Sequence, residues 1–268
     1  MEKRIIGRGV LLGGLGGLLA FLFARILAEP IIDRAIDYES GRDDAQMALD
    51  KAAGKPMDHE MGAELFTRGQ QANIGLGFGV IVLGMAMGAL FGVVYYLALR
   101  RAGKITARNL ALLVSGGMFL AVYAVPFLKY PANPPGSSDA DTIKERTGMF
   151  VVMIAISAVA LLAAVWLGRR LAARLGNWTA AVAAAASFTV VMAVVMLALP
   201  SFASETPEAL KDPSGAIVYP GFPAADLYEF RLYSFAAQAI LWIVIGVGFA
   251  WLAPRLLGER AESATAAA

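Results

Sequence analysis

The sequence predicts an all-α integral membrane protein: a bundle of about six transmembrane helices with Gly/Ala-rich packing faces and long acidic outer loops. Three observations predict this fold. Hydrophobic residues make up 58% of the chain and charged residues only 16%, against about a quarter charged in soluble domains. The apolar residues gather in runs that can cross a hydrocarbon core of about 30 Å. Basic and acidic residues are segregated between alternate connections, as in multi-pass membrane proteins.

Six apolar runs have the length of a membrane-spanning helix, and we expect them at about 5–28, 72–99, 110–128, 148–167, 180–199 and 234–253. The first run could be mistaken for a signal peptide, but Arg25 and Glu29 follow its core and no clean cleavage site is present, so we expect an uncleaved span. We therefore expect one membrane domain over 1–268. It carries an acidic, partly helical outer loop at 29–71 and a disordered cytoplasmic tail at 254–268.

Small residues recur at helical spacing in the first two runs. The glycines that repeat every four residues are Gly9, Gly13 and Gly17, then Gly84, Gly88 and Gly92. This spacing places each set on one helix face, where the absence of side chains lets two backbones approach. The fifth run uses alanine in the same way, as in TAAVAAAASF. Close helix packing is therefore predicted.

Basic residues predict the orientation. The short connections 100–109 and 168–179 contain Lys or Arg and no acid, and the N-terminus adds Lys3, Arg4 and Arg8. Cytoplasmic connections carry such an excess of bases, so both termini are predicted to be cytoplasmic.

Acidic residues collect on the opposite, predicted outer side. Of the 21 acidic residues, 18 lie in the segments 29–71, 129–147 and 200–233. An acidic surface raises the local concentration of cations. Outer loops are also polar for purely structural reasons, so two interpretations of this excess remain open.

Carboxylates near the outer ends of the first and last runs are the candidate metal ligands. A stripe with four-residue spacing comprises Arg25, Glu29, Asp33 and Asp37. It forms one helix face if the helix continues through Pro30, where a kink is expected. Charges near membrane depth usually find partners, and carboxylate oxygens suit divalent cations. The predicted metal ligands are Glu29, Asp33, Asp226 and Glu229.

The single histidine is a weaker candidate. His59 lies in MDHEM, with two acids and two methionines. Imidazole and carboxylate together can hold a transition metal weakly, although an ordinary surface histidine is the favoured interpretation. With one histidine and no cysteine, the chain alone cannot build a multi-histidine or thiolate metal site.

The third run ends in the unusual segment VPFLKYPANPPG, 125–136. Its prolines restrict the backbone, so neighbouring side chains are held at a lower entropic cost. Lys129 either extends to the lipid headgroups or pairs, like Arg25, with the candidate carboxylates at a pore mouth. The residues with a predicted structural or gating role are Arg25, Lys129, Pro131, Asn133, Pro134, Pro135, Arg146 and Arg231.

Several function classes are disfavoured. The chain has no phosphate-binding loop of the G-x-x-x-x-G-K-[ST] type, no cysteine nucleophile and no Ser or Asp motif in a catalytic context, so we expect neither ATP hydrolysis nor an enzyme. A net charge of +2 gives no nucleic-acid footprint. No cofactor is expected.

Three segments, FARILAEPIIDRAIDYE, VPFLKYPANPPG with the following DADTIKERTGMF, and FPAADLYEFRLYSFAAQAILW, resemble the CbtA family, which is described as a probable cobalt transporter subunit. The resemblance implies cobalt uptake linked to cobalamin synthesis, in a bacterial cytoplasmic membrane. It also implies a small one-span, histidine-rich partner, CbtB. Members are usually described with five spans, whereas six runs are present here.

Two functions from different classes follow. In the first, the chain is the membrane-embedded subunit of a cobalt (divalent metal cation) uptake system whose acidic outer face gathers Co²⁺ as cargo. In the alternative, it is a non-transporting membrane scaffold for a metal-handling partner. Close-packed glycine faces and stiff loops suit both.

Overall fold

The computed structural model describes residues 1–55, 67–103, 105–202 and 205–257. Over these residues the chain is almost entirely helical, and six helices are long and apolar enough to cross a membrane, which confirms the predicted fold class. The long helices are α1 (Glu2–Leu27), α2 (Glu29–Ala52), α4 (Leu76–Leu99), α5 (Ala107–Phe119), α7 (Ile143–Leu175), α8 (Asn177–Ala198) and α9 (Ala224–Leu256).

Shorter elements complete two of the spans. A helical turn α3 (Arg68–Gln70) and a π-helical turn η1 (Gln71–Gly75) lead into α4, and a second π-helical turn η2 (Leu120–Ala124) joins α5 to α6 (Val125–Lys129). The only strands in the described part of the chain are β1 (Leu210–Lys211) and β2 (Ile217–Tyr219), which pair antiparallel as a hairpin.

Several helices extend well past the predicted apolar runs. The fourth span was expected at 148–167 and α7 covers Ile143–Leu175; the last was expected at 234–253 and α9 covers Ala224–Leu256. Polar residues at a helix end can keep helical geometry outside the hydrocarbon core, because the backbone hydrogen bonds are internal to the helix. Hydropathy therefore locates the apolar part of a helix and not its ends.

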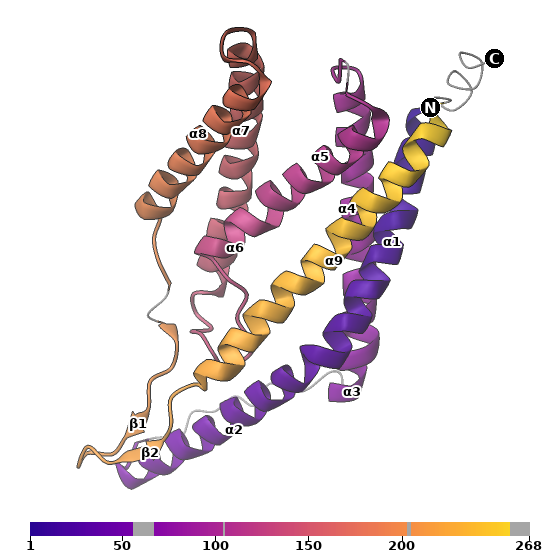
Figure 1. The fold of residues 1–268 in the computed structure, drawn as a ribbon. Helices are drawn as coiled ribbons and strands as arrows, with labels where there is room; N and C mark the ends of the chain where they lie inside the picture. The colour runs from indigo at the N-terminus through magenta and orange to yellow at the C-terminus, as the bar shows by residue number, and fades with distance from the viewer. Residues whose placement is uncertain (56–66, 104, 203–204, 258–268) are drawn as a thin grey trace, which may run out of the picture.

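The helices form two groups (Figure 1). The first contains α1, which packs along α4 and α9, together with α5, which packs on α9. The second is the antiparallel hairpin of α7 and α8, which meets the first group through η2 and α6. A buried aromatic cluster of Phe91, Tyr95 and Phe249 lies at the centre of the first group, with ring centroids 4.7–5.9 Å apart.

Glycine faces set the spacing of α1 and α4. A Cβ added to Gly88 would lie 2.9 Å from the Cα of Gly13, and one added to Gly13 would lie 2.9 Å from the Cα of Gly88. Further along the same antiparallel contact, Gly17 faces Val80 and Gly92 faces Ile6. The two helices thus approach at a distance that only glycine permits, as small residues do in membrane-helix pairs.

The two ends of the bundle differ (Figure 1). One end, which we call the terminal end, contains the beginning of α1, the end of α9 and the α4–α5 and α7–α8 connections. The opposite end, which we call the α2 end, contains α2, the β-hairpin and the segments 130–142, 199–202 and 205–223. Among the described residues, the basic connections lie at the terminal end and most of the acidic residues lie at the α2 end.

Helix α2 begins almost without interruption after α1 and turns across the α2 end (Figure 1). Ala28 keeps helical geometry between them, and its carbonyl accepts from the backbone N–H of Ile31 and Ile32 at 3.1 Å. Pro30 lies in the first turn of α2, where its missing N–H leaves no helical hydrogen bond unmade. The proline therefore fits at the bend without removing a hydrogen bond from the body of α2.

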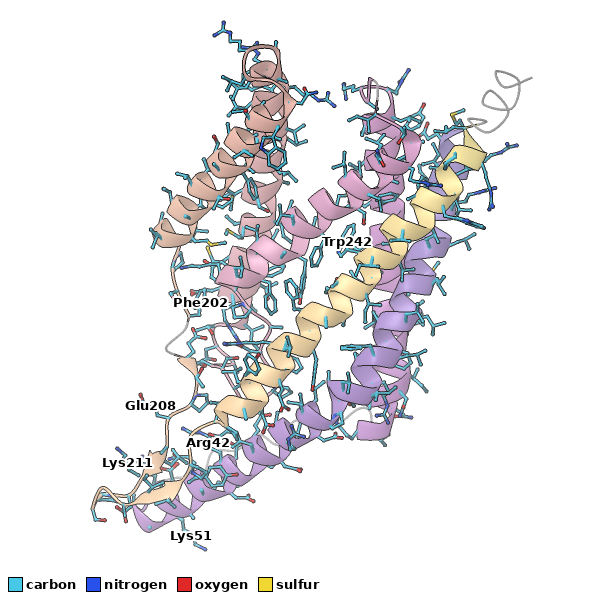
Figure 2. The ribbon with its side chains drawn as sticks, in the orientation of Figure 1. Arg42, Lys51, Phe202, Glu208, Lys211 and Trp242 are labelled. Carbon is cyan, nitrogen blue, oxygen red and sulfur yellow. The ribbon has the colours of Figure 1, made fainter. Side chains whose placement is uncertain are left out.

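The β-hairpin is anchored on α2. Tyr38 packs on Tyr219 and Phe222, with ring centroids 5.4 and 4.9 Å away, and its hydroxyl donates to the Pro220 carbonyl. Arg42 reaches from α2 to the Glu208 carbonyl at 2.7 Å (Figure 2). These contacts fix the α2 end as one packed layer.

Candidate functional site

Glu29 and Asp33, two of the predicted metal ligands, share one arginine. Arg68 donates through Nη2 to the Glu29 carboxylate, and through Nε to Asp33 Oδ1 at 3.1 Å. Glu29 is only 2% exposed, so its charge depends on this partner. We call Glu29, Asp33 and Arg68 the Arg68 cluster.

The position of Arg68 is set by a capping box. Thr67 accepts through its hydroxyl from the N–H of Gln70, and the Gln70 side chain accepts from the N–H of Thr67. This reciprocal pair starts the helix that leads into α4. Arg68, the first residue of that helix, is thereby held against the bend between α1 and α2.

Arg25, at the end of α1, has a different role. Its Nε donates to Asn73 Oδ1 at 2.9 Å, and the Asn73 amide donates to the Gly69 carbonyl at 2.8 Å. Arg25 therefore ties α1 to the π-helical turn η1 and forms no ion pair with the described carboxylates.

Asp226 and Glu229, the other two predicted ligands, also share an arginine. Arg34 on α2 donates to Asp226 Oδ1 from Nε at 2.8 Å and from Nη2 at 2.6 Å, and Nη2 lies 3.5 Å from Glu229 Oε2. The hydrogen bond to Asp226 raises the pKa of Arg34. We call Arg34, Asp226 and Glu229 the Arg34 cluster, and it joins α2 to the start of α9.

The arginine partners differ from the expected ones. The sequence suggested Lys129 and Arg25 as the counterions of these acids, whereas the structure pairs them with Arg68 and Arg34. In the described ranges, no group of three or more His, Cys, Asp or Glu side chains is placed to hold a metal ion. His59 lies outside the described residues. Metal binding by these side chains remains a prediction.

Most of the remaining predicted residues surround a single chamber of about 950 Å³ at the α2 end. Its walls come from the segment 127–136, the start of α7, the residues Ser201, Phe202 and Thr206, Glu39 of α2 and Arg231 of α9. The predicted structural or gating residues that line it are Lys129, Pro131, Asn133, Pro134, Pro135, Arg146 and Arg231. Arg25 is not part of this lining.

The loop 130–138 is held by its own hydrogen bonds. Tyr130 donates to the Pro200 carbonyl at 2.9 Å, and Ser137 donates to the Pro134 carbonyl at 2.6 Å. Gly136 has a φ of +63°, and a Cβ there would lie 2.7 Å from the Cβ of Glu39. Both the backbone conformation and the contact with α2 therefore require glycine at this position.

Charged side chains project from three elements around the chamber. Arg231 donates to Asn133 Oδ1 at 2.7 Å, and Arg146 donates to Ser138 Oγ at 2.7 Å while its Nε lies 3.6 Å from Glu205. Lys129 lies over the ring of Tyr130, 5.9 Å from the centroid. Among the described residues no carboxylate is within ion-pair distance of Lys129 or Arg231.

Sequence reasoning missed Arg34 and Arg68. Arg34 stands beside the four-residue stripe, and its partner Asp226 is 192 residues away. Arg68 is 39 residues from Glu29. A carboxylate near membrane depth needs a counterion. This requirement indicates that a partner exists, but it does not identify the residue.

Comparison with known proteins gives one family. The family model described as "Probable cobalt transporter subunit (CbtA)" matches residues 2–254 of the chain. No curated protein and no solved structure matches it.

Proposed function

Because the chain belongs to the CbtA family of probable cobalt transporter subunits, we propose that it is the membrane-embedded subunit of a Co²⁺ uptake system linked to cobalamin synthesis. In this proposal the α2 end faces outward in a bacterial cytoplasmic membrane, and both termini are cytoplasmic. The bases at the terminal end support this orientation.

The observation that carries the proposal is the placement of four carboxylates where α2 meets α3 and the start of α9. Each pair, Glu29 with Asp33 and Asp226 with Glu229, faces a single guanidinium. In each cluster a guanidinium of charge +1 therefore faces two carboxylates of total charge −2. A divalent cation would balance that charge more completely than the guanidinium does. We infer that Co²⁺ gathered by the acidic outer surface competes with Arg34 and Arg68 for these oxygens.

Selectivity and energy must come from elsewhere. Carboxylate oxygens do not strongly favour cobalt over magnesium or manganese. A histidine-rich one-span partner of the CbtB type would supply the imidazole ligands that this chain lacks. The sequence offers no nucleotide site, so the energy would come from an ion gradient, from the membrane potential, about 2.3 kcal/mol per charge per 100 mV, or from another protein.

A non-transporting scaffold is the second candidate, and one observation favours it. All four candidate carboxylates are already paired with arginine. In that case the two clusters act only as structural ties between α2 and the bundle, and the metal is handled by the partner.

Radioactive cobalt uptake separates the two candidates. Cells would express the chain with its CbtB-like partner, and the variants would be Asp33→Asn and Glu229→Gln. Asp37→Asn is the matched control, because Asp37 is exposed on the same helix and joins neither cluster. The transport proposal expects loss of uptake in the first two variants with partner binding retained, and normal uptake in the control. Uptake equal to that of empty cells for the unaltered pair would overturn it.

A further inference from the structure

The chamber at the α2 end is lined mainly by basic side chains, which a pathway for cations does not require. Three bases line it, Lys129, Arg146 and Arg231, against one lining acid, Glu39. Glu205 offsets Arg146. Lys129 and Arg231 have no acid partner among the described residues. A bare divalent cation is therefore repelled from this part of the chamber, and an anion is attracted.

The chamber lining also contains apolar side chains from the candidate membrane-spanning helices. Tyr123 and Phe127 come from the third span, and Phe150 comes from α7. At the rim, Leu128 is 73% exposed and Ile143 is 53% exposed. Leu128 ends the third apolar run and Ile143 stands shortly before the fourth, so both lie at the predicted edge of the hydrocarbon core. The chamber thus combines a cationic side with an apolar side that opens toward the bilayer.

We propose that this chamber binds the phosphate headgroup of an anionic phospholipid, with an acyl chain against Phe127 and Phe150. The ammonium of Lys129 and the guanidinium of Arg231 supply charge-assisted donors to phosphate oxygens. Asn133 positions Arg231 through their 2.7 Å hydrogen bond. The proline-rich loop keeps Lys129 at the chamber wall, so less side-chain freedom is lost on binding. The inference needs a membrane location only, and holds whether or not the chain carries cobalt.

Native mass spectrometry of the full chain, released from detergent with added lipid, tests the proposal. We expect the unaltered chain to retain phosphatidylglycerol in preference to zwitterionic phosphatidylcholine. Lys129→Gln and Arg231→Gln should each weaken phosphatidylglycerol binding about fivefold, as expected for one base near a lipid phosphate. Lys144→Gln is the matched control, because Lys144 is an exposed base on the first turn of α7 outside the chamber lining.

Glu39→Gln, a variant that we expect to fold normally, provides an independent test of the proposed lipid site. Glu39 is only partly buried and forms no ion pair among the described residues, so Glu39→Gln should fold and should bind phosphatidylglycerol more tightly than the unaltered chain. Lys129→Arg, which keeps the charge, should retain binding.

Three results would overturn the proposal. The first is equal retention of phosphatidylglycerol and phosphatidylcholine. The second is unchanged binding in both Lys129→Gln and Arg231→Gln, or weaker binding in Glu39→Gln. The third is binding of inorganic phosphate that depends on Lys129 and Arg231 without binding of phosphatidylglycerol, which would assign the chamber to a soluble anion.

Discussion

Arg68 donates to the buried carboxylate of Glu29 across the bend between α1 and α2. Arg68→Met should leave this carboxylate buried without a counterion. We expect a loss of about 2 kcal/mol of stability, between the values for exposed and for buried ion pairs, because Arg68 itself is one-third exposed. Thermal unfolding in detergent measures the loss. The double variant Glu29→Gln with Arg68→Met should recover most of the lost stability. A melting temperature of Arg68→Met equal to that of the unaltered chain would contradict the role of Arg68 as the counterion of Glu29.

Arg34 holds Asp226 and Glu229 from an exposed position. Arg34→Gln should therefore change stability by less than about 1 kcal/mol. If the guanidinium competes with the cation, the same variant should lower the cobalt concentration that gives half-maximal uptake, whereas Arg34→Lys should leave that concentration nearly unchanged. A higher half-maximal concentration in Arg34→Gln would argue against competition.

Gly88 allows α4 to contact α1 through the backbone. Gly88→Ala places a methyl group against the Gly9 carbonyl and the Gly13 Cα, so overpacking should cost about 1–3 kcal/mol. Gly79→Ala is the matched control on the same helix, because a Cβ there meets nothing within 4 Å. Its melting temperature should equal or exceed that of the unaltered chain. Equal melting temperatures for both variants would exclude tight α1–α4 packing at Gly88.

Ser157 links the α7–α8 hairpin to the rest of the bundle. Its hydroxyl donates to the carbonyl of Ala121 in η2, and the side chain is fully buried. Ser157→Ala leaves that interhelical bond unmade, at an expected cost of about 1–3 kcal/mol. Ser187→Ala should cost much less, because Ser187 bonds only to Ala183 of its own helix. Unfolding of both variants in detergent gives the comparison.

Glu39 gives a pH dependence. Burial, and secondarily the charge of Asp43, raises the pKa of the Glu39 carboxyl in the fold. The protonated form is thus favoured by folding, so this contribution to stability is present at acid pH and is lost as pH rises through the raised pKa. Glu39→Gln should raise the melting temperature at pH 7 and not at about pH 4. An equal effect at both pH values would show that charge is not the cause.

The number of spans could be predicted because hydropathy is read locally along the chain. The proline-rich segment was also informative: its residues Lys129, Pro131 and Asn133 line the chamber. Arg25 does not line it. Its partner is Asn73 in a π-helical turn, and such turns carry no hydropathy signal.

The partners of the carboxylates could not be predicted, because they depend on how α2 lies across the bundle. The bend at Ala28 and the contact of Tyr38 with Phe222 set that direction. Arg34 then faces α9, although Asp33 beside it faces Arg68. Neighbouring residues on one helix thus join different clusters, which spacing alone does not reveal.

The packing of α9 against α1 has a consequence for biosynthesis. Gly16 of α1 approaches Leu241 of α9 closely, and Leu12 lies where a Cβ of Gly248 would be. Helix α1 therefore packs on a helix that is synthesised much later than itself. Until α9 has been inserted, one side of α1 and α4 is covered by lipid or by an insertion factor. Closure of this group of helices therefore waits for α9, and truncation before α9 should leave a chain that the quality-control proteases of the membrane can recognise.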